Sequence, residues 1–280
     1  MRNNTDRVGA ADSSSPAAKM TAEQLAEKLS FVTPTEHVEL PSRGLFYAPN
    51  HPLHGQETIE IRHMTAKEED ILTSRALLKK GLALDRVLQN IIVDKRIDAL
   101  SLISGDRNAI IMATRIAAYG PKYDASVSCP SCGDTNKFSF FLDTEKIYHG
   151  EDADNFGVRR TDSGTFLTTL PTLGFEVEFR LMNGRDEKQM LNLNAKKRDE
   201  ENNVSKQLHT IIVSVEGLTD RSSLDLLIEK MPSSDARHVR TAYRLSSPNI
   251  DTSQTFECAS CEYTQDMEVP MTADFFWPDR

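Results

Sequence analysis

The alternation of apolar and polar residues first becomes regular at Thr58–Arg62, where a period of two predicts a β-strand. A helix is expected directly after it, because Thr65 and Glu68 have the spacing of an N-terminal capping box. Apolar residues at helical spacing predict two further helices, over 84–93 and 97–103. This part of the chain therefore predicts a strand followed by several short helices.

A longer helix and a β-hairpin are predicted next. The helix begins around Ser104–Asp106, and we interpret Asp106 as its N-cap, because aspartate is among the residues preferred there. Its apolar positions lead to a strand around Val127, and Phe138 and Phe140 alternate with polar residues on a strand that returns. Two antiparallel strands joined by a tight turn are the expected result.

The later part of the chain repeats the order of these elements. The run Val177–Glu187 matches the run Ile59–Glu69, with strand, arginine, methionine, helix start and charged first turn in the same sequence. We interpret the match as an internal duplication and predict an α+β fold of two strand–helices–hairpin halves, residues 37–142 and 165–280. The alternative is that two unrelated α+β segments share common helix starts. Further matches are Ile91–Val93 with Ile211–Val213, Asp106 with Asp235 and Cys129 with Cys258, with an insertion expected near Ser214–Arg221.

Two stretches lie outside the predicted halves. Residues 1–36 show little apolar periodicity, which predicts a flexible, disordered N-terminal tail. A short helix is expected within it at Thr21–Leu29, because Thr21 and Gln24 have capping-box spacing. Residues 143–164 are polar and acidic and are expected to form a linker or a long loop.

The four cysteines of the chain form two C-x-x-C pairs, Cys129 with Cys132 and Cys258 with Cys261. This spacing lets two thiolates at a tight turn bind one metal ion, and two such pairs complete the tetrahedral ligand set of a structural zinc site. The alternatives are four separate buried thiols or two redox-active dithiols. We predict one structural Zn²⁺ that is bound by all four cysteines and joins the two halves.

The composition limits the classes of partner. Asp and Glu total 42 against 33 Lys and Arg, and the resulting net charge of −9 disfavours binding to a nucleic-acid backbone. No apolar run approaches the roughly 20 residues that span a bilayer, and no apolar segment near Met1 resembles a signal peptide. We therefore expect a protein of a reducing cytoplasm that does not bind membranes.

The sequence motifs of several common enzyme classes are absent, among them G-x-S-x-G, H-E-x-x-H, Walker A and G-x-G-x-x-G. His51 and His54 lie close together, but no second cluster completes a metal shell, so we interpret them as loop residues. A zinc site with four sulfur ligands also leaves no open position for a substrate. We expect neither an enzymatic activity nor a small-molecule substrate.

Two apolar segments are candidates for contact with a partner protein: the turn around Pro41 and the C-terminal aromatic residues. Aromatic side chains contribute much of the binding energy in many interfaces. The alternative for the C-terminal rings is that they pack over the metal site. The candidate residues are Leu40, Pro41, Arg43, Phe46, Tyr47, Phe275, Phe276 and Trp277.

Several stretches together resemble one protein family. They are ELPSRGLFY at 39–47, MTAKEEDIL at 64–72, GDRNAI at 105–110, Tyr119–Gly120 and CPSCG at 129–133. The chain resembles the T4-type bacteriophage baseplate hub protein family from about residue 37 to the C-terminus, most clearly before residue 140. The resemblance implies a non-enzymatic protein that helps to build the baseplate of a contractile tail or its central hub, and it transfers no catalytic residues.

The resulting hypothesis is a baseplate hub or hub-assembly protein that acts through contacts with other phage tail or baseplate proteins. It would function in the host cytoplasm during assembly and, if it stays bound, in the tail baseplate of the virion. One alternative within this hypothesis is a tail-assembly chaperone that is absent from the finished virion. An alternative from a different class is a zinc-ribbon protein that binds nucleic acid.

Overall fold

The computed structural model describes residues 21–24, 33–196, 203–271 and 273–276. Its chain separates into two compact units, Met1–Pro34 and Thr35–Arg280. In the first unit, Thr21 and Gln24 exchange the two hydrogen bonds of the predicted capping box, each backbone N–H donating to the other side chain. The predicted continuation of this helix to Leu29 lies outside the described residues.

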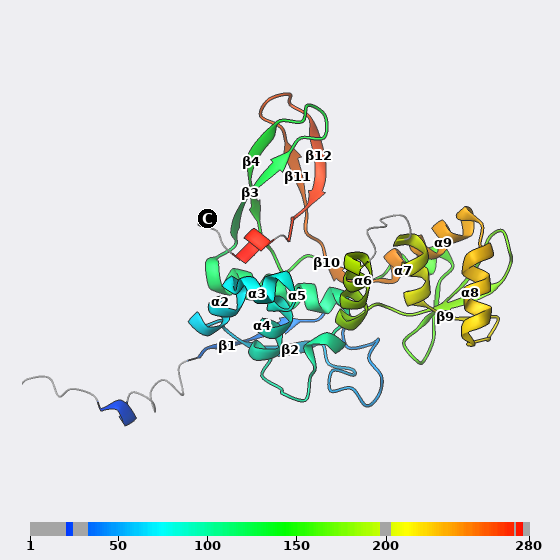
Figure 1. Ribbon diagram of the computed structural model, residues 1–280, viewed down its shortest axis with the longest axis horizontal. Coiled ribbons are helices and arrows are strands. Elements are labelled where there is room, and N and C mark those ends of the chain that lie inside the picture. Colours follow the sequence, from blue (N-terminus) through cyan, green and yellow to red (C-terminus); the bar gives the residue numbers. More distant parts are fainter. Residues whose placement is uncertain (1–20, 25–32, 197–202, 272, 277–280) are drawn as a thin grey trace, which may run out of the picture. The chain divides into compact units, whose positions relative to one another are not determined.

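Except at 97–103, the first half of the Thr35–Arg280 unit follows the predicted order of elements (Figure 1). The predicted strand Thr58–Arg62 and the capping box of Thr65 and Glu68 are confirmed. Strands β1 (Thr35–Glu39) and β2 (Thr58–Arg62) pair antiparallel, and β3 (Lys122–Ser128) and β4 (Thr135–Phe141) form the expected hairpin. The helical elements between them are α2 (Ala66–Thr73), α3 (Arg75–Lys79), α4 (Ala83–Ile91), the 3₁₀ turn η1 (Ala99–Ser101) and α5 (Ser104–Tyr119).

The helix predicted over 97–103 is wrong, because only the short turn η1 forms there. The side chain of Asp98 accepts a hydrogen bond from the N–H of Leu100 and so begins this turn. The backbone then becomes extended, and Ile103 pairs with Asn183 in an isolated antiparallel β-bridge. Pairing with a distant segment of the chain therefore replaces the helix that the local pattern favours.

The interpretation of Asp106 as a helix N-cap is also wrong. The N-cap of α5 is Ile103, and Asp106 lies inside the first turn with no solvent exposure. Its carboxylate accepts hydrogen bonds from the N–H and hydroxyl of Ser42 and from the Tyr47 hydroxyl, the latter at 2.7 Å. Burial raises the pKa of Asp106, although these three donors oppose the rise. Asp106 thus fastens the 40–47 turn to α5.

The segment 143–164 contains short elements that contact both halves. Strand β5 (Ile147–Tyr148) pairs antiparallel with β10 (Asn249–Ile250), and the Tyr148 hydroxyl donates to the carbonyl of Leu245 at 2.7 Å. A ring nitrogen of His149 lies 2.9 Å from the carbonyl oxygen of Pro41. The 3₁₀ turn η2 (Asp154–Phe156) and strand β6 (Arg159–Arg160) follow.

The second half contains a four-stranded antiparallel sheet in the order β6-β7-β8-β9. Helix α8 is longer than its counterpart in the first half, since only its last turn corresponds to η1, and its start adjoins the insertion expected near 214–221. The strands are β7 (Phe166–Thr169), β8 (Glu176–Phe179), β9 (Ile212–Val215), β11 (Ser253–Glu257) and β12 (Thr264–Glu268); the helices are α6 (Gly184–Lys196), α7 (Asn203–Ile211), α8 (Arg221–Lys230), α9 (Ser233–Ser246) and the 3₁₀ turn η4 (Ala273–Phe276).

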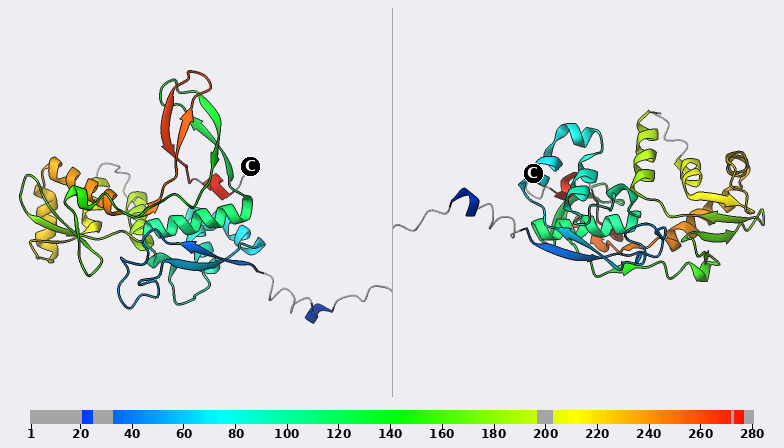
Figure 2. Two further views of the ribbon diagram at one scale, coloured as in Figure 1. Left: turned by 180° about the vertical axis from the view of Figure 1, so that it is seen from behind. Right: turned by 90° about the horizontal axis from the view of Figure 1, so that it is seen from below.

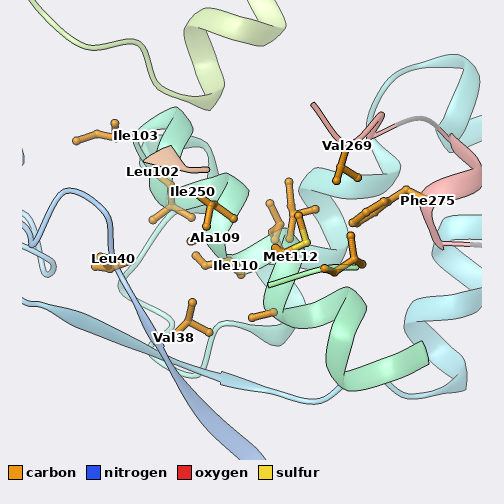
Figure 3. Close-up of a cluster of buried hydrophobic side chains, with 14 of the residues drawn as sticks. Val38, Leu40, Leu102, Ile103, Ala109, Ile110, Met112, Ile250, Val269 and Phe275 are labelled. Carbon is orange, nitrogen blue, oxygen red and sulfur yellow. The ribbon is translucent and has the colours of Figure 1, made fainter. Parts of the chain in front are cut away.

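Helix α5 lies at the centre of the larger hydrophobic core, which takes side chains from both halves (Figure 3). Ile110 and Met112 of α5 are buried among Leu40 from the first half and Val269 and Phe275 from the C-terminal part. A second cluster lies within the later half, between its sheet and the helices α7, α8 and α9. Because the larger core includes both ends of the Thr35–Arg280 unit, neither half buries all of its apolar surface alone.

The start of α2 and the start of α6 are built by the same set of contacts. Arg62 at the end of β2 forms two hydrogen bonds with the carboxylate of Glu68, at 2.7 and 3.1 Å, and Glu68 also accepts from the N–H of Thr65. Arg180 after β8 forms two hydrogen bonds with Asp186, at 2.7 and 2.8 Å. The N–H of the helix-start residue again donates to that carboxylate. Each pair fixes the direction in which a helix leaves its strand.

A second set of contacts also occurs in both halves. Leu-Pro-Ser-Arg-Gly at 40–44 and Leu-Pro-Thr-Leu-Gly at 170–174 both follow a strand, and both end in a glycine with positive φ, 69° and 73°. The turn at 40–44 donates to the buried carboxylate of Asp106, and the N–H groups of Thr172 and Leu173 donate to that of Asp235. The shared Leu-Pro-Ser/Thr-x-Gly pattern is a sequence signal that the comparison of strands and helix starts did not include.

The Arg62–Glu68 pair should make stability depend on pH in the acid range. Burial opposes ionisation of Glu68, but hydrogen bonds from Arg62 and Thr65 outweigh it and lower its pKa to about 2. The native state therefore binds fewer protons than the unfolded chain, in which this pKa is about 4.3. The stabilising contribution, at most about 3 kcal/mol, is complete above pH ~5 and is lost as the pH falls towards 2.

We expect Glu68→Gln to lower the free energy of unfolding near neutral pH and to converge with the unmodified protein as the pH falls from about 5 to 2. Urea unfolding at a series of pH values measures the difference. Glu69→Gln, on the exposed face of the same helix, is the matched control and should change little. A difference between Glu68→Gln and the unmodified protein that stays constant across this range would contradict the assignment.

Candidate metal centre

Two β-hairpins present the two cysteine pairs in turns of the same construction. In the first, the N–H of Cys129 donates to the carbonyl of Asp134 at 2.8 Å, and the N–H of Gly133 donates back to Cys129 at 2.9 Å. In the second, Cys258 donates to Tyr263 at 2.9 Å, and Glu262 donates back to Cys258 at 3.0 Å. Each turn closes directly beyond its strand pair, so the register of the strands fixes where the sulfurs lie.

The hairpins β3–β4 and β11–β12 lie side by side and extend together from the helices (Figures 1 and 2). The rings of Phe138 and Phe256 pack edge to face between them, with centroids 5.5 Å apart. Nearer the helices, the side-chain amide of Gln254 accepts from the N–H of Phe141 at 2.9 Å and donates to its carbonyl at 2.8 Å. Apolar packing and a two-way hydrogen bond thus align the turns.

The alignment brings all four sulfurs within 4.8 Å of one another. Cys129 and Cys261 have their sulfurs 3.7 Å apart, and Cys132 and Cys258 have theirs 3.7 Å apart. A metal ion with four sulfur ligands at ~2.3 Å in a tetrahedron requires sulfur separations of ~3.8 Å. The site therefore fits such an ion, and the separations are too long for the ~2.05 Å of a disulfide bond. All four predicted cysteines are brought together, and sequence and structure agree on this cluster.

The protein surroundings make the four sulfurs unequal. Burial opposes ionisation of Cys258, but the N–H groups of Ser260 and Cys261 and the neighbouring thiols lower its pKa to about 6. The N–H of Asp134 favours the thiolate of Cys132, yet desolvation and the other sulfurs raise its pKa to about 12. Cys258 therefore forms a thiolate readily, and its negative charge opposes ionisation of the neighbouring thiols. A bound cation would offset this repulsion.

One polar contact to this cluster was not predicted from the sequence. The side-chain amide of Asn136, on β4, donates to the sulfur of Cys258 in the other hairpin at 3.4 Å. Such outer hydrogen bonds orient metal ligands and stabilise their negative charge. Nothing in the sequence identifies Asn136, because the contact exists only once the two hairpins are aligned.

Most of the predicted partner-binding residues lie inside the protein. Tyr47 and Phe275 are 5% and 1% exposed, and η4 packs its rings near α5, where the backbone carbonyl of Phe275 accepts from the Arg115 side chain. The C-terminal rings thus contribute to the core at the base of the hairpins. Arg43 is exposed and Phe46 half-buried, whereas Leu40, Pro41, Tyr47, Phe275 and Phe276 are buried and Trp277 lies outside the described residues.

The two cysteine turns differ in one residue that affects stability. Gly133 has φ of 77°, and the equivalent position holds Glu262 with φ of 55°, in the left-handed region that costs an L-residue roughly 1–2 kcal/mol. We expect Glu262→Gly to raise the free energy of unfolding of the metal-loaded protein by about 1 kcal/mol. Denaturant unfolding in the presence of metal measures the change.

The reverse substitution is the control. Gly133→Ala should lower stability by a similar amount, because no atom lies within 4 Å of the added Cβ and only the backbone conformation opposes it. Equal stability of both variants and the unmodified protein would show that the positive φ values carry no cost.

Comparison with known proteins identifies the family of the chain. The model of one family, described as T4 bacteriophage base plate protein, matches residues 37–277, a range that includes both cysteine pairs. No curated protein and no solved structure matches the chain significantly. Among the described residues, no helix has both the length and the apolar character needed to cross a membrane. The chain belongs to the T4 bacteriophage base plate protein family.

Proposed function

We propose that this protein is a non-enzymatic component of the baseplate hub, or of the machinery that assembles the hub, and that it acts through contacts with other tail proteins. The observation that carries the proposal is the family match over residues 37–277 together with a four-sulfur site inside the matched range. A catalytic zinc site keeps one position open for water or substrate, whereas here a sulfur is available for each of the four positions.

The proposal includes an internal duplication of the Thr35–Arg280 unit. Its support is the agreement of contacts: an arginine bonded to the first acidic residue of a helix, and a buried aspartate that accepts from a Leu-Pro-Ser/Thr-x-Gly turn, occur once in each half. Both contacts precede a helix and a cysteine hairpin in the same order. Unrelated segments would share helix caps by chance, but not two sets of contacts in one order.

The proposed metal is a single structural Zn²⁺ bound by Cys129, Cys132, Cys258 and Cys261. Four thiolates in tetrahedral positions favour zinc over the harder cations that oxygen ligands bind. Because each half supplies one cysteine pair, the ion would join two hairpins that are distant in the sequence. Its binding energy would then contribute directly to folding of the whole unit.

Metal analysis of the purified full-length protein should find one zinc per chain, and removal by a chelator should lower the thermal unfolding temperature. Cys132→Ser should lose the metal and the stabilisation with it, since an exposed thiol is replaced by a poor zinc ligand. Ser131→Ala, a substitution between the ligands, is the matched control and should retain both. A variant with all four cysteines changed to serine that folds with unchanged stability would refute the structural role.

Surface charge supports a protein partner over nucleic acid. The paired hairpins expose six carboxylates and two lysines, which would repel a phosphate backbone. The residues are Asp124, Asp134, Glu257, Glu262, Asp266 and Glu268 against Lys122 and Lys137.

The place of the protein in the virion separates the two forms of the proposal. We expect quantitative mass spectrometry of purified tails to find it in a fixed ratio to other baseplate proteins. Its presence only in lysate complexes with a tail protein would instead identify an assembly chaperone that leaves before the virion is complete. Tight, salt-sensitive binding of DNA or RNA by the pure protein, without any tail-protein partner, would refute both forms.

A further inference from the structure

The two halves of the Thr35–Arg280 unit meet through a short antiparallel pair of extended segments. The N–H of Ser104 donates to the carbonyl of Met182, and the N–H of Gly184 donates to that of Leu102, both at 3.1 Å. The first segment ends at the first residue of α5, and the second ends at the first residue of α6. We name these segments, 102–104 and 182–184, the inner edges.

Each inner edge has an equivalent in the other half. Counting from the matched arginines at the helix starts, 182–184 corresponds to 64–66, directly before and at the start of α2. Counting from the matched buried aspartates, 102–104 corresponds to 231–233, directly before and at the start of α9. We name 64–66 and 231–233 the outer edges; the correspondence rests on the proposed duplication.

The outer edges have the same hydrogen-bonding groups as the inner edges but do not use them. Among the described residues, no partner exists for the carbonyls of Met64 and Met231 or for the N–H groups of Ala66 and Ser233. Ala66 and Ser233 are exposed, whereas their equivalents Gly184 and Ser104 are buried and half-buried. Each outer edge therefore keeps one backbone donor and one backbone acceptor. Their positions in the sequence match those of the groups that pair the two inner edges.

The two outer edges cannot pair with each other within one chain. Helix α2 and helix α8, whose ends adjoin the outer edges, lie at opposite ends of the Thr35–Arg280 unit in every view of Figures 1 and 2. We infer that the partner is a second copy of this chain, whose 64–66 edge pairs with the 231–233 edge of the first, head to tail. Such a contact joins different surfaces, so it produces a ring if the rotation closes and a filament if it does not.

The side chains next to the edges are compatible with this pairing. At the inner edges, the space beside Gly184 is filled by the guanidinium of Arg107, whose nearest nitrogen would lie 3.1 Å from an added Cβ. At the outer edges, Ala66 takes the place of Gly184 and Ala236 takes the place of Arg107. The methyl group of Ala66 would thus face a small residue, and Ala236 cannot form the ion pair that Arg107 makes across the inner junction with Glu187, at 3.7 Å.

Sedimentation velocity of the purified, metal-loaded full chain, from micromolar to near-millimolar concentration, tests the inference. We expect the average mass to rise with concentration above that of one chain. Ala66→Pro and Ser233→Pro each remove one edge donor, and each should weaken association about tenfold. Both residues are the first of a helix and follow an extended residue, where proline is tolerated, so thermal stability should be retained.

Arg75→Pro is the matched control, because it places proline at the first position of α3 and touches neither outer edge. It should associate as the unmodified chain does. A chain that stays monomeric over the whole range, or association that the double variant Ala66→Pro/Ser233→Pro leaves unchanged, would overturn the inference. Either result would leave the proposed baseplate function standing, because that function is decided by metal content and by presence in tails.

Discussion

Four cysteine sulfurs that share one small space constrain the rest of this structure. The sulfurs that lie 3.7 Å apart come from different hairpins, and the hairpins are separated by the whole second sheet and its helices in the sequence. Thiolates this close repel one another unless a cation lies among them. A bound ion would therefore stabilise the closure of a very long loop, whose conformational freedom in the unfolded chain is correspondingly large.

The features that could be predicted from the sequence are those that neighbouring residues determine. The strand at Thr58–Arg62, the capping box of Thr65 and Glu68 and the two cysteine turns each depend on residues a few positions apart. Asp106 could not be placed, because its partners Ser42 and Tyr47 lie far away in the chain. The extended backbone before α5 was missed for the same reason, since only pairing with the second half excludes a helix there.

The apolar turn at 40–47 illustrates what a hydrophobic pattern leaves undetermined. The same residues are suitable for an interface or for a core, and the pattern does not distinguish the two. In the structure, the buried carboxylate of Asp106 needs donors, and the turn supplies them while its apolar side chains fill the space beside α5. The need of a buried carboxylate for hydrogen-bond donors therefore determines where this apolar segment packs.

The two halves agree in the contacts that build each half and differ where the halves meet. The arginine–carboxylate pairs and the aspartate–turn contacts occur in both. At the junction, Gly184 and Arg107 belong to one edge pair only, and their equivalents are two alanines. Ion pairs that cross the inner junction, Arg107 with Glu187 and Arg185 with Asp98, add contacts that the outer edges lack. Outer edges that rely on backbone hydrogen bonds alone would therefore associate more weakly and more reversibly than the inner edges.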